Sequence, residues 1–156
     1  FLGVERMRRI LFVCFGNICR SPMAEFIMKD LVKKRGLESE FLIESRATST
    51  AELGNPVNPP ARDELRMHGI GCAGKTARQL TARDYREFDL LLAMDDRNVR
   101  DILRITGGDP DCKVRRMTEF TGGAEVDDPW YTRRFDIAYR DILRGCEGWL
   151  EHLAGE

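Results

Sequence analysis

The sequence predicts a doubly wound α/β fold, in which a four-stranded parallel sheet carries helices on both faces. Short runs rich in β-branched and aromatic residues alternate with longer stretches of helical apolar spacing. Residues 90–94 are apolar throughout, which is typical of a central strand in a parallel sheet. Residues 134–153 place apolar side chains three or four positions apart, which indicates a long final helix. Strands and helices in alternation favour one sheet covered on both sides.

Local signals then assign each element. Residues 10–13 predict the first strand. Ser21 and Pro22 predict the start of the first helix, because a serine side chain can cap the helix amides and the first helical position does not need the amide hydrogen that proline lacks. Cations followed by glycine at residues 33–36 end that helix. The remaining expectations are a strand at 41–47, a loop at 48–60, a helix at 61–68, a helix capped by Thr81, a helix at 98–105 after Asp95 and Asp96, and an edge strand at 113–117.

Composition limits the class of protein. The chain has 156 residues, 42% of them hydrophobic and 33% charged, with a net charge of −1. This length and composition suit a single domain, which we expect over residues 7–156. We expect residues 1–6 to be a leader or an added segment. The charge argues against nucleic acid as a partner, and no apolar run suggests a membrane span or a signal peptide. Five cysteines without C-x-x-C spacing indicate a reducing compartment, hence a cytoplasmic protein.

The strand, turn and helix within residues 10–35 carry a distinctive chemistry. Cys14 lies at the strand exit and Arg20 at the helix entry, with Gly16 and Asn17, which tolerate positive φ, between them. Unpaired amide groups at a helix start bind oxyanions, and the same field stabilises a thiolate. The planar fork of Arg20 suits two oxygens of a phosphate. A thiol beneath such a loop predicts covalent phosphoryl transfer.

The stretch C-F-G-N-I-C-R-S-P at residues 14–22 resembles the active-site loop of the low-molecular-weight protein tyrosine phosphatases, and the resemblance continues along most of the chain. It implies a flavodoxin-like (phosphotyrosine phosphatase I-like) fold and a hydrolase that needs no cofactor and no metal. It also implies that Cys14 is the nucleophile and that Arg20 binds the phosphoryl group. Cys19 is expected either to form a reversible disulfide with Cys14 or to be a small apolar residue facing the helix. The phosphate-binding loop is expected to consist of Phe15, Gly16, Asn17, Ile18, Cys19 and Arg20.

The second chemical feature is V-D-D-P-W-Y at residues 126–131. A phenolic leaving group needs a proton, which a second carboxyl group has to supply. The stretch resembles the D-P-Y-Y general-acid loop of the same family, and the match makes Asp128 the acid. Trp130 and Tyr131 are expected to form an aromatic rim for a flat substrate ring. Leu53 is expected to complete this rim from a loop that resembles the family's second active-site loop.

A polar network is expected to hold the phosphate-binding loop rigid. In the family a histidine supports the asparagine and the serine of the loop, and the resemblance assigns this network to Asn17, Ser21, Ser45 and His68. The alternative for His68 is a helix-end residue that interacts with the last carbonyl groups of the helix.

A nucleotide-binding protein is an alternative of another class. Residues 69–76, G-I-G-C-A-G-K-T, match the Walker A pattern, and L-L-L-A-M-D at residues 90–95 could pass for a Walker B strand. A Walker A loop follows a buried strand, however, whereas this match follows a charged helical stretch. The context therefore favours the phosphatase over the P-loop.

Three further alternatives keep a similar loop. Thioredoxin-coupled arsenate reductases need two redox cysteines close together downstream, whereas Cys72, Cys112 and Cys146 are far apart. Arginine phosphatases tend to have threonine where Ile18 stands, so an apolar side chain favours a phosphotyrosine protein or peptide as the partner. A non-catalytic anion-binding module needs only the loop, and Asp128 argues for an enzyme. The sequence does not predict the oligomeric state, and no ligand pair has the spacing of a zinc site.

Overall fold

The computed structural model describes residues 7–155, so the expected leader at residues 1–6 lies outside the described part of the chain. Four strands form one sheet in the order β2-β1-β3-β4, and each neighbouring pair is parallel. The strands are β1 (Arg8–Cys14), β2 (Phe41–Ala47), β3 (Leu90–Ala93) and β4 (Val114–Arg116). The order places β3 inside the sheet and β4 at its edge, as the sequence predicts.

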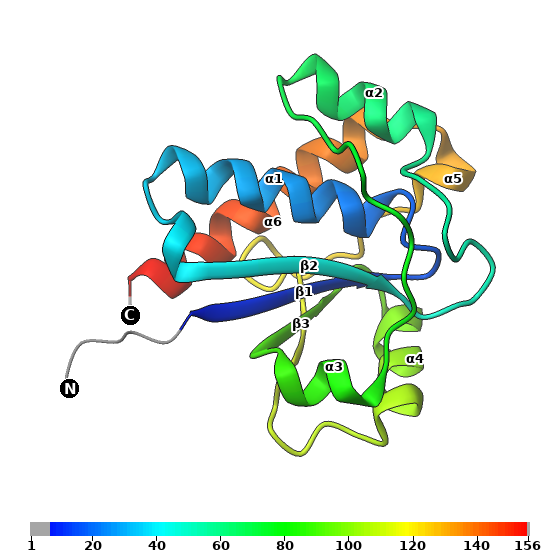
Figure 1. The fold of residues 1–156 in the computed structure, drawn as a ribbon, viewed down its shortest axis with the longest axis vertical. Helices are drawn as coiled ribbons and strands as arrows, with labels where there is room; N and C mark the ends of the chain where they lie inside the picture. Colours follow the sequence, from blue (N-terminus) through cyan, green and yellow to red (C-terminus); the bar gives the residue numbers. More distant parts are fainter. Residues whose placement is uncertain (1–6, 156) are drawn as a thin grey trace.

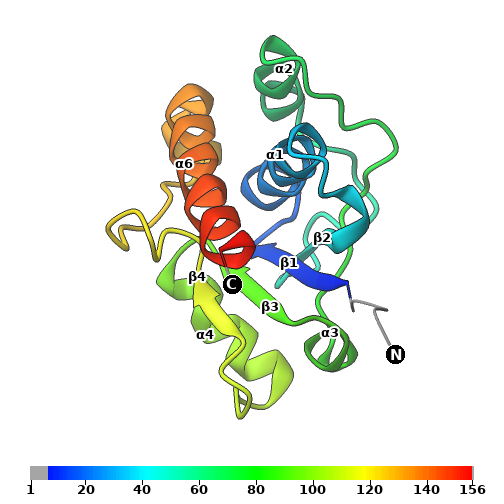
Figure 2. The same cartoon turned by 90° about the vertical axis from the view of Figure 1, so that its left-hand side faces the viewer.

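Helices cover both faces of this sheet, as Figure 1 and Figure 2 show. One side carries α1 (Arg20–Lys34), α2 (Pro59–Met67) and α6 (Phe135–Ala154), and the other carries α3 (Ala82–Glu87) and α4 (Asp96–Thr106). Two short elements, η1 (Glu38–Glu40) and α5 (Pro129–Thr132), were not expected from the sequence. The doubly wound α/β fold is confirmed. Over residues 7–155, no helix combines the length and the apolar composition that a membrane crossing requires.

The side chains of β1 alternate between two hydrophobic cores. Ile10, Phe12 and Cys14 belong to the core beneath α1 and α6, whereas Leu11 and Val13 belong to the core beneath α3 and α4. All five are almost completely buried. Burial on both faces explains the continuous apolar run of this strand. It also places Cys14, the last residue of β1, at the carboxyl edge of the sheet on the α1 side.

The helix starts follow the predicted signals with one exception. Thr81 caps α3 and Asp95 caps α4, and each side chain accepts a hydrogen bond from the third amide of its helix. The expected cap at Ser21 is wrong, because α1 begins one residue earlier and no side chain caps it. Ser21 is therefore buried in the first turn, where its hydroxyl contacts the sulfur of Cys14.

Candidate active site

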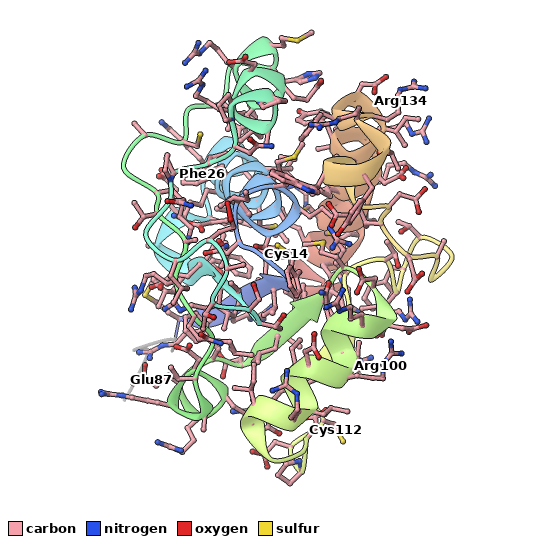
Figure 3. The ribbon with its side chains drawn as sticks, turned by 90° about the vertical axis from the view of Figure 1, so that its right-hand side faces the viewer. Cys14, Phe26, Glu87, Arg100, Cys112 and Arg134 are labelled. Atoms are coloured by element: carbon pink, nitrogen blue, oxygen red, sulfur yellow. The ribbon has the colours of Figure 1, made fainter. Side chains whose placement is uncertain are left out.

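The phosphate-binding loop joins the end of β1 to the start of α1. Figure 3 shows Cys14 near the centre of the view. Asn17 has a φ of 58°, in the left-handed region that asparagine tolerates. This turn brings the amide nitrogen of Asn17 within 3.3 Å of the Cys14 sulfur. Cys14 is 3% exposed, and the loop that follows it leads directly into the amide groups at the start of α1. Such groups stabilise an anion, so the site suits both a thiolate and a bound phosphate.

Three buried polar side chains hold this turn in place, as the resemblance predicts. The amide Nδ2 of Asn17 donates to Ser21 Oγ at 2.7 Å and to Ser45 Oγ at 2.9 Å. The amide Oδ1 of Asn17 accepts from the backbone of Arg78 at 3.1 Å, which fixes the orientation of the side chain. Ser21 Oγ lies 3.0 Å from the Cys14 sulfur. The strained backbone of Asn17 is thus supported by contacts from α1, from β2 and from residue 78.

His68 does not take part in this network, so its predicted role is wrong. Its ring stacks on Tyr139 with the centroids 3.7 Å apart, and its Nε2 lies 3.1 Å from Glu64. The reason is its place at the C-terminal end of α2, where its ring stacks on Tyr139 of α6. The network instead continues from Ser45 to Glu25 and then to Lys75. The sequence does not single out Glu25, and it places Lys75 only in a nucleotide-binding pattern.

Arg20 is held at the mouth of the loop by an ion pair and a carbonyl group. Its Nη1 donates to Asp95 at 2.7 Å and to the carbonyl of Val126 at 2.8 Å, and its Nη2 lies 3.5 Å from Asp128. Burial alone would lower the pKa of Arg20, but the charges of Cys14, Asp128 and Asp95 outweigh it and raise the pKa above its ordinary value. The guanidinium is therefore a fixed cation. The sequence predicts Asp95 only as a helix cap, although its place two residues after the end of β3 could mark it as a site residue.

A cavity of about 200 Å³ joins the loop to the acid segment. Cys14, Arg20 and Asp128 line it together, with Trp130 and Tyr131 at its rim. Further residues that line it are Phe15, Gly16, Ile18, Cys19, Ala51 and Glu52. The structure thus brings together the predicted nucleophile, phosphate ligand and acid. It adds a carboxylate, Glu52, that sequence reasoning did not single out.

Leu53 is not among the residues that line this cavity in the described chain, so its predicted place at the rim is wrong. Residues 51–54 form a tight turn that ends at Gly54, which has a φ of 82° and donates its amide to the carbonyl of Ala77. The turn places Ala51 and Glu52 at the cavity, while Leu53 is exposed.

The second cysteine of the loop differs from the first in its surroundings. Cys19 is buried, and burial raises the pKa of its thiol to about 12, although a hydrogen bond from Asn58 opposes this. Cys19 therefore stays a thiol at neutral pH. It lines the cavity beside Cys14, and both are free cysteines in the structure. The predicted disulfide between them stays a prediction.

The Walker A match at residues 69–76 does not form a phosphate-binding loop. It follows the end of α2, and the next helix begins only at Ala82. Lys75 points away from solvent, with its ammonium group 3.3 Å from Glu25 and 3.0 Å from the carbonyl of Ser45. Among residues 7–155, no cluster of histidine, cysteine, aspartate or glutamate is placed to hold a metal ion.

Comparison with known proteins identifies the family. The family model for low molecular weight phosphotyrosine protein phosphatase matches residues 9–156. The chain belongs to this family. The low molecular weight protein-tyrosine-phosphatase YfkJ of Bacillus subtilis is 37% identical over 153 residues, covering 96% of this chain and 98% of that protein. Its crystal structure has a TM-score of 0.94 at 35% identity, with 98% of each chain covered.

Two other solved structures of similar proteins are named for different phosphatase activities. A low molecular weight protein tyrosine phosphatase from Streptococcus pyogenes has a TM-score of 0.85 at 40% identity, covering 94% of this chain and 93% of that one. A Drosophila protein named an arginine phosphatase has a TM-score of 0.85 at 31% identity, covering 92% and 96%. Membership of the low-molecular-weight phosphatase family therefore fixes the fold and the kind of enzyme, and does not favour the nucleotide-binding alternative.

Proposed function

We propose that this enzyme hydrolyses phosphotyrosine in proteins or peptides through a cysteinyl-phosphate intermediate. The observation that carries the proposal is the shared cavity, where a buried cysteine, a fixed arginine and a partly exposed aspartate meet within about 200 Å³. A nucleophile, a cation for the phosphate oxygens and a proton donor are the groups that this reaction needs.

The proposed reaction has two steps. The Cys14 thiolate attacks phosphorus in line with the departing oxygen, while the loop amides and Arg20 hold the other phosphate oxygens. Asp128 protonates the phenolate as it leaves, so the phosphorus–oxygen bond breaks as the phosphorus–sulfur bond forms. In the second step the Asp128 carboxylate takes a proton from water, which attacks phosphorus and releases phosphate and Cys14. Fixed donors around developing charge account for most of the expected rate enhancement.

The cavity walls support an aromatic substrate. Trp130 and Tyr131 are exposed at the rim, and Phe15 lies across the loop with the guanidinium of Arg97 4.5 Å from its ring centroid. A phenyl ring can stack on such side chains. Ile18 presents an apolar side chain to the cavity, which favours a phenyl group over a charged guanidinium.

The first test compares wild type with Cys14→Ser in the presence of a chelator. We expect wild type to hydrolyse an aryl phosphate and a phosphotyrosine peptide, and the serine variant to have no measurable turnover, because the hydroxyl is a poor nucleophile at neutral pH. Equal turnover by the variant would contradict the mechanism. A phosphoarginine peptide of the same sequence serves as the second substrate. Faster hydrolysis of that peptide than of the phosphotyrosine peptide would reassign the substrate.

A reducing compartment such as the cytoplasm fits the cysteines, and we propose it as the location. All five cysteines are free in the structure, and four of them are buried. Oxidation would begin at Cys14, with Cys19 as the neighbouring thiol that condenses with it. The protective disulfide remains part of this proposal.

A further inference from the structure

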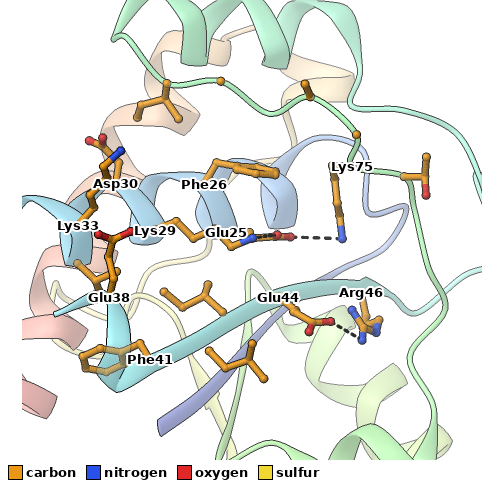
Figure 4. Close-up of a pocket in the computed structure, with 18 of the residues that line it drawn as sticks. Glu25, Phe26, Lys29, Asp30, Lys33, Glu38, Phe41, Glu44, Arg46 and Lys75 are labelled. Carbon is orange, nitrogen blue, oxygen red and sulfur yellow. Dashed lines mark hydrogen bonds and ion pairs between the residues drawn. The ribbon is translucent and has the colours of Figure 1, made fainter. Parts of the chain in front are cut away.

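A cavity of about 840 Å³ lies between α1, β2 and the segment that precedes α3, and its walls carry several charges. Figure 4 shows two pairs of opposite charge in these walls, with Lys75 3.3 Å from Glu25 and Arg46 2.7 Å from Glu44. Such pairs are satisfied within the protein, so they do not require a charged ligand. Two arginines beside the active-site cavity lack partners of this quality.

Arg97 stands beside the active-site cavity with most of its hydrogen-bonding groups unused. Its guanidinium carbon lies 4.5 Å from the centroid of the Phe15 ring, which lines the cavity. Within residues 7–155 its one ion pair joins Nε to Asp101 at 3.8 Å, and 62% of the side chain is exposed. Arg97 is also the second residue of α4, where the helix dipole disfavours a cation. The helix and this loose pair therefore do not account for an arginine at this position.

Arg133 holds a similar position on the acid segment. Its guanidinium carbon lies 6.0 Å from the centroid of the Trp130 ring, which also lines the cavity. It follows α5 with a φ of 62°, a conformation that glycine adopts at lower cost. Over the part of the chain that the structure describes, Arg133 forms no ion pair. A second exposed cation is thus placed against a ring of the cavity without a carboxylate partner.

The two arginines lie outside the cavity itself. Neither is among the residues that line it in the described chain, so a phosphoryl group and a phenyl ring within it would not contact them. The residues on either side of a phosphotyrosine, however, have to leave the cavity past the rings of Phe15 and Trp130. Stacking on a ring restricts each guanidinium, so less freedom is lost when it binds a carboxylate. Its planar fork suits the two oxygens of that group.

We infer that Arg97 and Arg133 select phosphotyrosine flanked by aspartate or glutamate, by pairing with these carboxylates outside the cavity. The inference rests on the proposed function and adds the sequence context of its substrate. Glu52 lines the cavity and Asp127 is exposed beside it along the chain, and these carboxylates would instead favour a basic flank. Both of them lack a ring that would hold the charge in place, so we expect the arginines to dominate.

The test measures the dissociation constants of three phosphotyrosine peptides with Cys14→Ser, which binds them without turnover. The peptides differ only in the residues on both sides of the phosphotyrosine, which are glutamate, glutamine or lysine. We expect the glutamate peptide to bind about tenfold more tightly than the glutamine peptide, because one exposed ion pair contributes about two- to fivefold. The lysine peptide should bind more weakly than either. High salt should reduce the preference, since it screens exposed charges.

Substitutions in the Cys14→Ser protein assign the preference to the two arginines. Arg97→Gln and Arg133→Gln should each reduce the ratio of the two dissociation constants to about threefold, and together they should abolish it. Arg97→Lys keeps the charge and should keep part of the preference. Arg100→Gln is the matched control, because Arg100 is an exposed arginine on the same helix. It should leave the ratio within about twofold of the unsubstituted value.

The ratio is taken within each protein, so a general loss of binding, such as one caused by movement of Phe15, cancels. Equal binding of the glutamate and glutamine peptides, or tighter binding of the lysine peptide, would overturn the inference. So would an effect of Arg100→Gln as large as that of Arg97→Gln. Hydrolysis by wild type tests the proposed function separately: if it does not hydrolyse these peptides while the ratios hold, that function fails and the selection of acidic flanks stands.

Discussion

The phosphate-binding loop at residues 14–20 and the acid segment at residues 126–132 line the same cavity, yet they are built in opposite ways. Five of the seven loop residues are buried, whereas four of the seven residues in the acid segment are exposed. Side chains from α1 and β2 brace the loop through Asn17. The acid segment is tied to the rest chiefly through Val126, whose amide donates to the carbonyl of Met94 and whose carbonyl accepts from Arg20.

This difference follows from what each region has to do. Charge on a transferring phosphoryl group is stabilised best by donors that are fixed before the reaction begins. A proton donor and an aromatic rim have to admit substrates of different shapes, so they lie on an exposed segment. Substitutions in the loop should therefore slow the hydrolysis of every substrate to the same extent. The effect of substitutions in the acid segment should depend on the substrate.

The largest expected effect is that of Arg20→Lys. The lysine keeps the charge but loses the fork that satisfies Asp95 and the Val126 carbonyl while it binds phosphate. We expect kcat/KM to fall by about 10³-fold, since the loss of one transition-state donor already costs about 10² to 10³. The fall should be equal for nitrophenyl phosphate and for a phosphotyrosine peptide.

Arg100→Lys is the control, because Arg100 is exposed on α4 and does not line the cavity. It should leave kcat/KM within about twofold of wild type, as surface substitutions do. Near-normal activity of Arg20→Lys would refute the role assigned to the guanidinium.

Asp128→Asn should have a smaller effect that depends on the leaving group. The amide cannot give a proton, and general acid catalysis contributes about 10² to 10⁴ in rate. We expect a fall in kcat of about 10² for phenyl phosphate but less than about tenfold for nitrophenyl phosphate, whose leaving group needs little protonation. Initial rates over a series of substituted phenyl phosphates measure the trend.

The neighbouring Asp127→Asn supplies the comparison. Asp127 is exposed and does not line the cavity with Arg20, so its loss should change kcat by less than about threefold. A loss that is the same for all leaving groups in Asp128→Asn would show that Asp128 acts through its contact with Arg20 and not as a proton donor.

The two regions also differ in what the sequence could predict. The strand, the glycine–asparagine turn and the helix are local signals, and they predicted the loop from Cys14 to Arg20. The supports of the loop come from distant parts of the chain, and spacing along the sequence could not distinguish His68 from Lys75 as the residue that reaches Ser45. His68 ends a helix that packs on α6, whereas Lys75 follows a second turn at residues 73–74 and reaches the carbonyl of Ser45.

Rim residues were harder to predict for a related reason. Which side chain of a turn faces a cavity depends on its backbone angles, and the positive φ of Gly54 ends the turn with Glu52 facing the cavity and Leu53 exposed. Trp130 and Tyr131 could be placed because they follow Asp128 in the short helix α5, which the Asp128 side chain caps. Proximity along the chain to Asp128 therefore predicted these two rim residues. The direction in which a side chain of a turn points, as for Leu53, does not follow from the sequence pattern.

The smallest expected effect belongs to the rim and isolates substrate binding. Trp130 is half exposed, so Trp130→Ala removes a stacking surface without disturbing the buried loop. We expect KM for a phosphotyrosine peptide to rise about fivefold with kcat nearly unchanged, because a ring contact of this kind is worth about 0.5–1.5 kcal/mol. Trp130→Phe, which keeps a ring, should recover most of the loss. If kcat falls as much as kcat/KM in Trp130→Ala, the side chain positions Asp128 in the transition state, and the division between a catalytic loop and a substrate-binding rim is wrong.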